Sequence, residues 1–302
     1  MKHLLSISQL TKEELYHLLD LADQLKKEVK NGEFKPYLKN KTLGMIFQKA
    51  STRTRVSFEV GMQQLGGYPL YLNANDMQIG RGEPIQDTAR VLSRYLDGIM
   101  IRTFAQQDVI DLSNYGNIPI INGLTDFAHP CQILADLMTI REFKGKLEGL
   151  KMCYIGDGNN MCNSLIAGAL KAGMKMSVAT PIGYEPDENV VAEAKKNPDF
   201  FLCNDPKEAI VDADVVVTDV WASMGEENEA EERRKVFEGI YQVNDELMAF
   251  AKPDAMVQHC LPAHRGEEIT EQVFEAHAAE IFEEAENRLH AQKAVLVTLL
   301  KD

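Results

Sequence analysis

The sequence is poor in several features that define whole classes of protein. Its five cysteines are odd in number and scattered without a CxxC pair, so neither a disulfide framework nor a structural zinc site is indicated. No apolar run is long enough to cross a bilayer, and the first residues lack the apolar core of a signal peptide. We therefore expect a reduced, cytoplasmic protein with no membrane partner.

Basic residues are scarce relative to acidic ones. The chain has 32 Lys and Arg against 46 Asp and Glu, a net charge of −14. Because phosphate backbones attract basic surfaces, nucleic acid is not expected as a partner. An anionic small substrate would need a local cluster of positive charge inside this acidic protein. With 302 residues and 45% hydrophobic content, the chain can build one large or two medium domains.

Short apolar runs alternate with segments of helical length along the whole chain, which is typical of parallel sheets in an α/β protein. We predict two domains, each a parallel sheet flanked by helices. Residues 1–145 form the first domain, closed by a C-terminal helix of residues 286–302, and residues 146–285 form the second. Strands are expected at residues 42–47, 70–72, 98–101, 118–121, 151–155, 176–179, 215–219 and 255–259, and longer helices at 11–29, 129–143 and 286–300.

The run Ser51-Thr52-Arg53-Thr54-Arg55 directly follows the first predicted strand and opens a helical segment. The first turn of a helix leaves backbone N–H groups unpaired and carries partial positive charge, so it favours an anion. Hydroxyls and a planar guanidinium add donors that match phosphate oxygens. The same residues also fit an ordinary Ser/Thr N-cap beside two solvent arginines, and the run alone does not decide between the two.

Further polar side chains follow the other strands of the first block. Arg102 ends one strand, and His129 opens the helix that joins the blocks, with Gln132 on the same helical face. Each is also compatible with a surface or capping role. Together, Arg102 and His129 offer two donors that could polarise a carbonyl oxygen. Arg288 is a further candidate cation, expected at the start of the last helix.

In the second block, the run of residues 156–160 begins like a dinucleotide-binding fingerprint. Met161 replaces its third glycine, and the next strand ends at Thr180-Pro181 rather than at an acid, so a nicotinamide cofactor is not expected. Asp219 could pair with an ammonium group or cap a helix. Cys260 beside His259 suggests a thiol hydrolase, but neighbours on an extended strand point to opposite faces.

Together these motifs resemble the aspartate/ornithine carbamoyltransferase family over essentially the whole chain. The signatures shared across that family are residues 51–55 and His129-Pro130-x-Gln132. Those of its ornithine-accepting branch are residues 156–160, 219–225 and 259–262. The resemblance implies two α/β domains with the active site in the interdomain cleft, no metal or cofactor, and a homotrimer or a multiple of trimers.

The reaction implied by the resemblance transfers the carbamoyl group of carbamoyl phosphate to the side-chain amine of L-ornithine, giving L-citrulline and phosphate in arginine metabolism. Two alternatives stay open: a putrescine carbamoyltransferase, and a catalytically silent relative that acts as a binding subunit. Cys260 would lie beside the amine, as a thiolate or sulfur acceptor that orients or deprotonates it. Gln78 would reach the phosphate site of a neighbouring subunit.

The family resemblance assigns the site residues as follows. The catalytic group is Cys260, Arg102 and His129. Carbamoyl phosphate would be bound by Ser51, Thr52, Arg53, Thr54, Gln78, Arg102, His129, Gln132, Cys260, Leu261 and Arg288. Ornithine would be bound by Asn160, Asp219, Ser223 and Met224.

Overall fold

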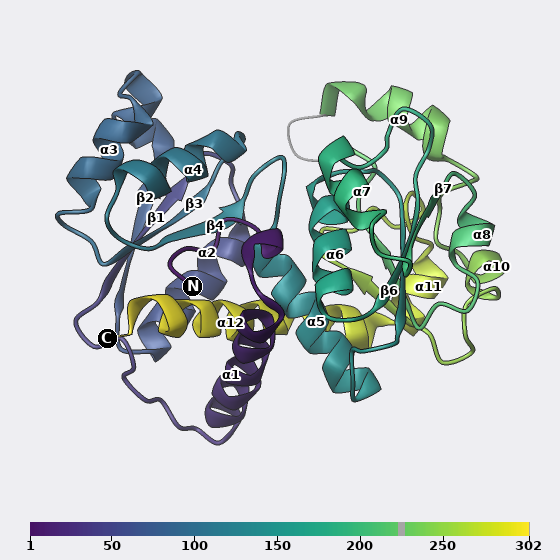
Figure 1. Cartoon of the computed structure of the whole chain (residues 1–302), viewed down its shortest axis with the longest axis horizontal. Coiled ribbons are helices and arrows are strands. Elements are labelled where there is room, and N and C mark those ends of the chain that lie inside the picture. The colour runs from purple at the N-terminus through teal and green to yellow at the C-terminus, as the bar shows by residue number, and fades with distance from the viewer. Residues whose placement is uncertain (223–226, 302) are drawn as a thin grey trace. The chain divides into compact units, whose positions relative to one another are not determined.

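The computed structural model describes residues 1–222 and 227–301, which form two compact units (Figure 1). Unit 1 comprises Met1–Ala135 and Asn287–Asp302, and unit 2 comprises Asp136–Glu286. The boundaries fall inside two helices, α5 (Pro130–Lys144) and α12 (Ala278–Leu300). The division by function at residues 145 and 146 stays a prediction.

Unit 1 contains a four-stranded parallel sheet in the order β2-β1-β3-β4. Helices α3 and α4 pack against each other over one face of it (Figure 1). The strands are β1 (Thr42–Phe47), β2 (Tyr68–Asn73), β3 (Gly98–Arg102) and β4 (Ile120–Leu124). The helices are α1 (Lys12–Lys30), α2 (Thr52–Gln64), α3 (Ile85–Leu92) and α4 (Gln106–Tyr115), with short 3-10 turns at Ile7–Gln9, Ala74–Asp76 and Ile79–Arg81.

The inner strands β1 and β3 are apolar over most of their length because helices cover both faces of the sheet, whereas the edge strand β2 is partly exposed. On one face, Ile46 and Ile101 pack with Leu112 of α4. Elsewhere in the unit, α2 lies so close to α12 that a Cβ on Gly61 would stand 3.2 Å from Cγ of Lys293. This close approach packs α2, the helix that begins at the predicted phosphate-binding run, against the last helix.

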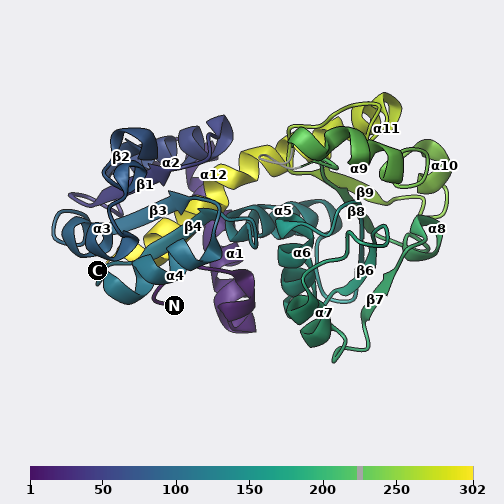
Figure 2. The ribbon, with the colours of Figure 1, turned by 90° about the horizontal axis from the view of Figure 1, so that it is seen from above.

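Unit 2 contains a five-stranded parallel sheet in the order β7-β6-β5-β8-β9. Helices α6 and α7 lie on one side of it, and α8 and α10 on the other (Figure 2). The strands are β5 (Lys151–Ile155), β6 (Lys175–Ala179), β7 (Phe200–Cys203), β8 (Val215–Thr218) and β9 (Met256–His259). The helices are α6 (Asn160–Lys171), α7 (Glu188–Ala194), α8 (Pro206–Ala209), α9 (Ala230–Phe237), α10 (Asp245–Met248) and α11 (Glu271–Ala276), with a 3-10 turn at Glu227–Glu229.

The core of unit 2 follows the alternation of its strands. Ile155, Val216 and Val257 point to one face and share a buried cluster with Trp221 and Phe237, whose rings stack 5.7 Å apart. Among residues 1–222 and 227–301, no helix combines the length and the apolar character needed to span a bilayer.

The predicted α/β class with two parallel sheets is confirmed, and two elements differ from expectation. Strand β7 was not predicted, since it is an edge strand whose residues are only partly buried. Helix α12 begins at Ala278, earlier than the predicted residue 286, because the Ala- and Glu-rich stretch before that point favours helix without an apolar stripe. The prediction that Arg288 stands at the start of the last helix is therefore wrong: it lies inside α12.

Each sheet reverses its strand order at one point, between β1 and β3 in unit 1 and between β5 and β8 in unit 2. Open parallel sheets bind ligands at such reversals, beyond the carboxyl ends of the strands. In unit 1 the residues at this point are Ser51 and its neighbours after β1, and Arg102 at the end of β3. In unit 2 they are Asn159 after β5 and Asp219 after β8.

Candidate active site

The start of α2 is shaped to expose two of the predicted phosphate ligands. Ser51 is the N-cap, and its hydroxyl accepts from the backbone N–H of Thr54 at 3.2 Å. Thr52 and Arg53 are exposed, whereas the Thr54 side chain is buried. The first turn therefore presents its helix-terminal positive charge, one hydroxyl and one guanidinium to an incoming anion.

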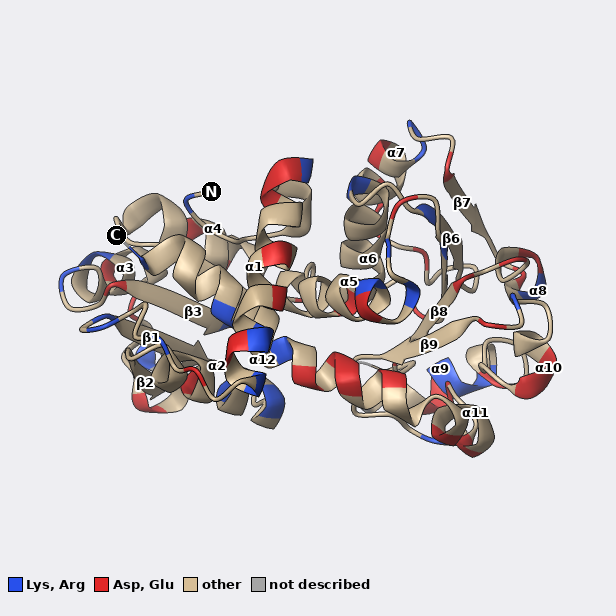
Figure 3. Ribbon diagram, turned by 90° about the horizontal axis from the view of Figure 1, so that it is seen from below, with Lys and Arg blue, Asp and Glu red and all other residues tan. Residues whose placement is uncertain are grey.

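Arg288 ties three elements of unit 1 together behind that turn. Its Nη1 donates to Oε1 of Gln132 on α5 at 2.7 Å, and its Nη2 donates to the Thr54 hydroxyl on α2 at 3.1 Å. Gln292, with its amide oxygen turned toward the guanidinium, accepts from Nε at 3.1 Å and from Nη2 at 2.9 Å. The structure thus joins Arg288, Gln132 and Thr54 in one buried network. Figure 3 shows basic segments gathered beside α2 and α12.

His129 and Arg102 belong to the same electropositive region. Burial lowers the pKa of His129 well below its usual value, and the charges of Arg288, Arg102 and Arg53 lower this pKa further. The imidazole is therefore neutral at physiological pH and can offer one N–H to a carbonyl oxygen. Arg102 is also buried and keeps its charge. A neutral donor beside a permanent cation suits an oxygen on which negative charge develops.

Two further residues bear on the sequence-based picture. Lys49, which the sequence analysis did not single out, is buried between β1 and α2, pairs with Asp126 and places its Nζ 4.4 Å from the centre of the Phe104 ring. Its only sequence signal was a cation two residues before Ser51. Gln78 is exposed, and within the described residues its side chain makes no hydrogen bond, so its role toward a neighbouring subunit stays a prediction.

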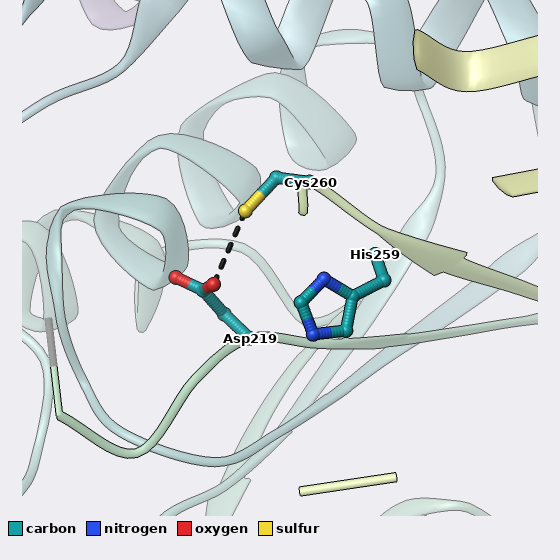
Figure 4. Close-up of side chains that lie close together, drawn as sticks. All are labelled: Asp219, His259 and Cys260. Atoms are coloured by element: carbon teal, nitrogen blue, oxygen red, sulfur yellow. Dashed lines mark hydrogen bonds between the residues drawn. The ribbon is translucent and has the colours of Figure 1, made fainter. Parts of the chain in front are cut away.

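Asp219 is the centre of the polar group in unit 2. Its Oδ1 accepts from the backbone N–H of Val220 at 2.8 Å. The same oxygen accepts from the Cys260 thiol, with Sγ 3.1 Å away (Figure 4). Its Oδ2 accepts from Nδ2 of Asn159 at 3.0 Å. Three donors around this buried carboxylate fix its direction.

The surroundings of Cys260 do not fit one of the two states expected for it, a thiolate. Burial raises the pKa of its thiol well above the usual value, and the negative charge of Asp219 raises this pKa further. Cys260 is therefore a protonated thiol that donates to Asp219. A thiolate that deprotonates the amine does not fit these surroundings.

His259 does not pair with the Cys260 thiol, as the sequence analysis expected: among the three side chains drawn in Figure 4, the hydrogen bond joins Cys260 to Asp219. Its Nδ1 accepts from the backbone N–H of Leu261 at 2.9 Å, and its Nε2 lies 2.9 Å from Oε1 of Glu268. Potential ligand atoms of Asp219, His259 and Cys260 lie within 4.8 Å of one another. Both imidazole nitrogens already have protein partners, however, so this trio is a poor metal site.

The ornithine ligands predicted in unit 2 are only partly described. Asn160 is the first residue of α6, but it is Asn159, the N-cap, that bonds to Asp219. Ser223 and Met224 lie outside the described residues. The sequence analysis also missed the buried ion pair between Arg233 and Asp157, at 3.0 Å, in which Arg233 also donates to the Trp221 carbonyl oxygen.

Comparisons with known families agree with this arrangement. The model of the carbamoyl-P binding domain of aspartate/ornithine carbamoyltransferase matches residues 2–142, and the model of the Asp/Orn binding domain matches residues 148–299. These two matches, which together span nearly the whole chain, place it in a class of group transferases. The chain belongs to the aspartate/ornithine carbamoyltransferase family, and it is a carbamoyltransferase.

Several ornithine carbamoyltransferases are similar to this chain over nearly its full length. Ornithine carbamoyltransferase of Carboxydothermus hydrogenoformans is 60% identical over 301 residues, which cover 98% of this chain and 96% of that protein. The ornithine carbamoyltransferase structure from Pyrococcus furiosus superposes with a TM-score of 0.94 at 54% identity, covering 99% of this chain and 97% of that one. The anabolic enzyme of Campylobacter jejuni gives 0.93 at 43% identity, covering 99% of both chains.

Proposed function

We propose that this protein transfers the carbamoyl group of carbamoyl phosphate to the side-chain amine of L-ornithine, forming L-citrulline and phosphate. The observation that carries the proposal is the hydrogen bond between the Cys260 thiol and the buried Asp219 carboxylate at the strand ends of unit 2. Relatives at 52–60% identity over nearly the full chain carry the name ornithine carbamoyltransferase, which supports the same acceptor.

The acceptor follows from the charge of the unit 2 group. A buried carboxylate attracts the ammonium group of an amino acid and repels a second carboxylate. Asp219 therefore favours ornithine over aspartate, whose side chain is itself an anion. Putrescine has no α-carboxylate, so the residues expected to hold that group separate the two amines. Asn160 is one of them, at the start of α6, where helix-terminal N–H groups favour an anion.

The donor follows from the group in unit 1. The phosphate of carbamoyl phosphate would lie on the first turn of α2, against Ser51, Thr52 and Arg53. Arg288 would hold Thr54 and the Gln132 amide oxygen in place through its two hydrogen bonds. The Gln132 oxygen has a second lone pair, which would accept from the carbamoyl NH₂. Leu261 would contribute its backbone carbonyl to the same NH₂ group.

The chemistry needs a neutral amine and a stabilised oxygen. The side-chain amine has an ordinary pKa near that of lysine, about 10, so it must lose a proton before it attacks. As the amine adds, negative charge builds on the carbonyl oxygen, which would accept from the neutral His129 N–H and from Arg102. Phosphate is an adequate leaving group, so the reaction requires neither a covalent enzyme intermediate nor a metal. Cys260, held on Asp219, would orient the amine beside its thiol.

The assembly and the location stay predictions. The family resemblance favours a homotrimer or a multiple of trimers, in which Gln78 of one subunit would reach its neighbour's phosphate site. Sedimentation of the parent protein would give the assembly, and a Gln78→Ala variant would show a raised KM for carbamoyl phosphate if the contact exists. The cytoplasmic location rests on the sequence features described above.

The acceptor is tested by comparing ornithine, putrescine and aspartate at one fixed concentration of carbamoyl phosphate. We expect citrulline from ornithine at the highest kcat/KM. Preferred carbamoylation of putrescine would refute the proposal and favour a putrescine carbamoyltransferase. Release of neither citrulline nor any carbamoylated amine by a folded protein that binds carbamoyl phosphate would favour the silent binding subunit.

A further inference from the structure

Two buried groups that the proposed chemistry does not use meet at the end of β9. His259 is 1% exposed and Glu268 is 0% exposed, and Nε2 of the first lies 2.9 Å from Oε1 of the second. Placing a carboxylate in an apolar core is unfavourable unless its partners are in place. A buried pair of this kind needs a structural or functional explanation. Because His259 directly precedes Cys260, the pair can support the chain at that residue.

The hydrogen bonds of His259 determine which nitrogen carries the proton. Nδ1 accepts from the backbone N–H of Leu261 at 2.9 Å, so the hydrogen is on Nε2, which donates to Glu268. Oε1 of Glu268 also accepts from the backbone N–H of His264 at 2.6 Å. One buried carboxylate thus holds both ends of the segment 259–264, and Cys260 and Leu261 lie between those ends.

Leu261 needs that support. Its φ is +58°, in the left-handed region that is unfavourable for residues other than glycine. Such a conformation persists only where the surroundings hold it, and the bond from its N–H to His259 does so. The residue before it, Cys260, is thereby directed at the Asp219 carboxylate, 3.1 Å away.

We propose that His259 and Glu268 are positioning residues, which hold the Cys260–Leu261 turn so that the thiol stays on Asp219 and the Leu261 carbonyl keeps its direction. Neither side chain touches substrate in the reaction described above. The kinetic consequence rests on the proposed function, whereas the geometric consequence, the placement of the Cys260 thiol, does not.

Two substitutions at one position cut the two links separately. In His259→Gln the side-chain amide nitrogen can take the place of Nε2 and keep the bond to Glu268, but nothing accepts from the Leu261 N–H. In His259→Asn the amide oxygen can take the place of Nδ1 and keep the Leu261 bond, while Glu268 loses its donor. Ile210→Ala serves as control, since it removes buried volume from the same core but removes neither hydrogen bond of His259.

The direct readout is alkylation of Cys260 by iodoacetamide, followed by mass spectrometry, with half-exposed Cys203 of the same chain as internal reference. The thiolate is the reacting species, and the contact with Asp219 together with burial keeps Cys260 protonated. We expect alkylation of Cys260 relative to Cys203 to rise about tenfold in His259→Gln and about threefold in His259→Asn, as expected when a buried hydrogen bond is lost. Ile210→Ala should match the parent.

The kinetic readout separates positioning from general destabilisation. In His259→Gln we expect the KM for ornithine to rise about tenfold and the KM for carbamoyl phosphate to rise less, because the released turn holds the thiol beside the amine but contributes only the Leu261 carbonyl to carbamoyl phosphate. Ile210→Ala should lower the melting temperature without this split. Parental alkylation in both His259 variants would overturn the proposal, and if His259→Gln does not fold, a parental rate in His259→Asn alone would overturn it.

Failure of this inference is distinguishable from failure of the proposed function. Increased alkylation in a protein that carbamoylates no ornithine would retain the positioning role and refute the acceptor. Efficient citrulline formation with unchanged alkylation and unchanged KM for ornithine in the His259 variants would refute the positioning role and retain ornithine as the acceptor.

Discussion

Replacing Asp219 by Asn changes one oxygen of the acceptor site to an NH₂ group and removes its charge. Oδ1 accepts from Val220 N–H and from the Cys260 thiol, and an Asn oxygen can take over both bonds. Oδ2 accepts from Nδ2 of Asn159, whose own oxygen is already used by the N–H groups of Met161 and Cys162. The new NH₂ therefore faces a donor that cannot turn, and we expect a loss of about 1–3 kcal/mol in the free energy of unfolding.

The effect on substrate binding is larger and selective. A hydrogen bond to a charged group contributes about 1.5–3 kcal/mol, which corresponds to a rise of about 10- to 150-fold in the KM for ornithine. The KM for carbamoyl phosphate should stay within about twofold, since the groups proposed for its phosphate lie in unit 1 and Asp219 is not among its ligands. Steady-state citrulline formation with each substrate varied in turn gives both constants.

Asp214→Asn is the matched control, because Asp214 stands at the opposite end of the same strand, β8. It is as buried as Asp219, accepts from the backbone N–H of Lys151 at 2.8 Å and pairs with Lys252 at 2.7 Å. We expect a comparable loss of stability with both KM values unchanged. A KM for ornithine in Asp219→Asn within about threefold of the parent's would refute the assignment of this carboxylate to the ammonium group.

Three further substitutions test other parts of the site. Arg53→Ala should lower kcat/KM about 10²- to 10³-fold with an unchanged melting temperature. Arg55→Ala is the control, because the Arg55 guanidinium lies 3.7 Å from the centre of the Tyr71 ring, and its kcat/KM should stay near the parent's. Similar losses in both variants would contradict the role of Arg53. Cys260→Ser should lower kcat and raise the KM for ornithine more than that for carbamoyl phosphate, and the opposite order would count against its place beside the amine. Burial lowers the pKa of Lys293 from 10.5 to about 8, so its charge opposes folding below pH 8 and this penalty disappears as pH rises toward 10.5. Urea unfolding should therefore show Lys293→Met more stable than the parent at pH 7 and the difference shrinking by pH 10; a constant difference would refute the pKa shift.

The strands could be predicted from the sequence where both faces of the sheet are covered. Residues 42–47 and 151–155 were predicted to the residue, because a strand buried on both faces reads as a continuous apolar run between polar ends. Strand β7 lies at a sheet edge, so its sequence carries little of this signal. The extra turns of α12 escaped prediction for the related reason that they depend on helix propensity rather than on an apolar stripe.

The site was predictable as a set of residue types but not as a set of contacts. Motifs at strand ends indicated Arg102, His129 and Asp219 without any coordinates. The bond from Arg288 to Thr54 joins positions 234 residues apart, and no local pattern encodes it. The protonated state of Cys260 likewise depends on burial and on a carboxylate 41 positions away. Pairwise geometry, not composition, decides such properties.

The discontinuous make-up of unit 1 has a consequence for biosynthesis. A ribosome delivers residues 1–135 first, yet the helix segment that completes their unit begins only at Asn287. Until that segment emerges, the surface of α2 around Gly61 stays uncovered, and the partner of Thr54 and Gln132 does not yet exist. The contiguous residues 136–286 can complete their own unit earlier, so the usual order of domain maturation during translation is reversed in this chain.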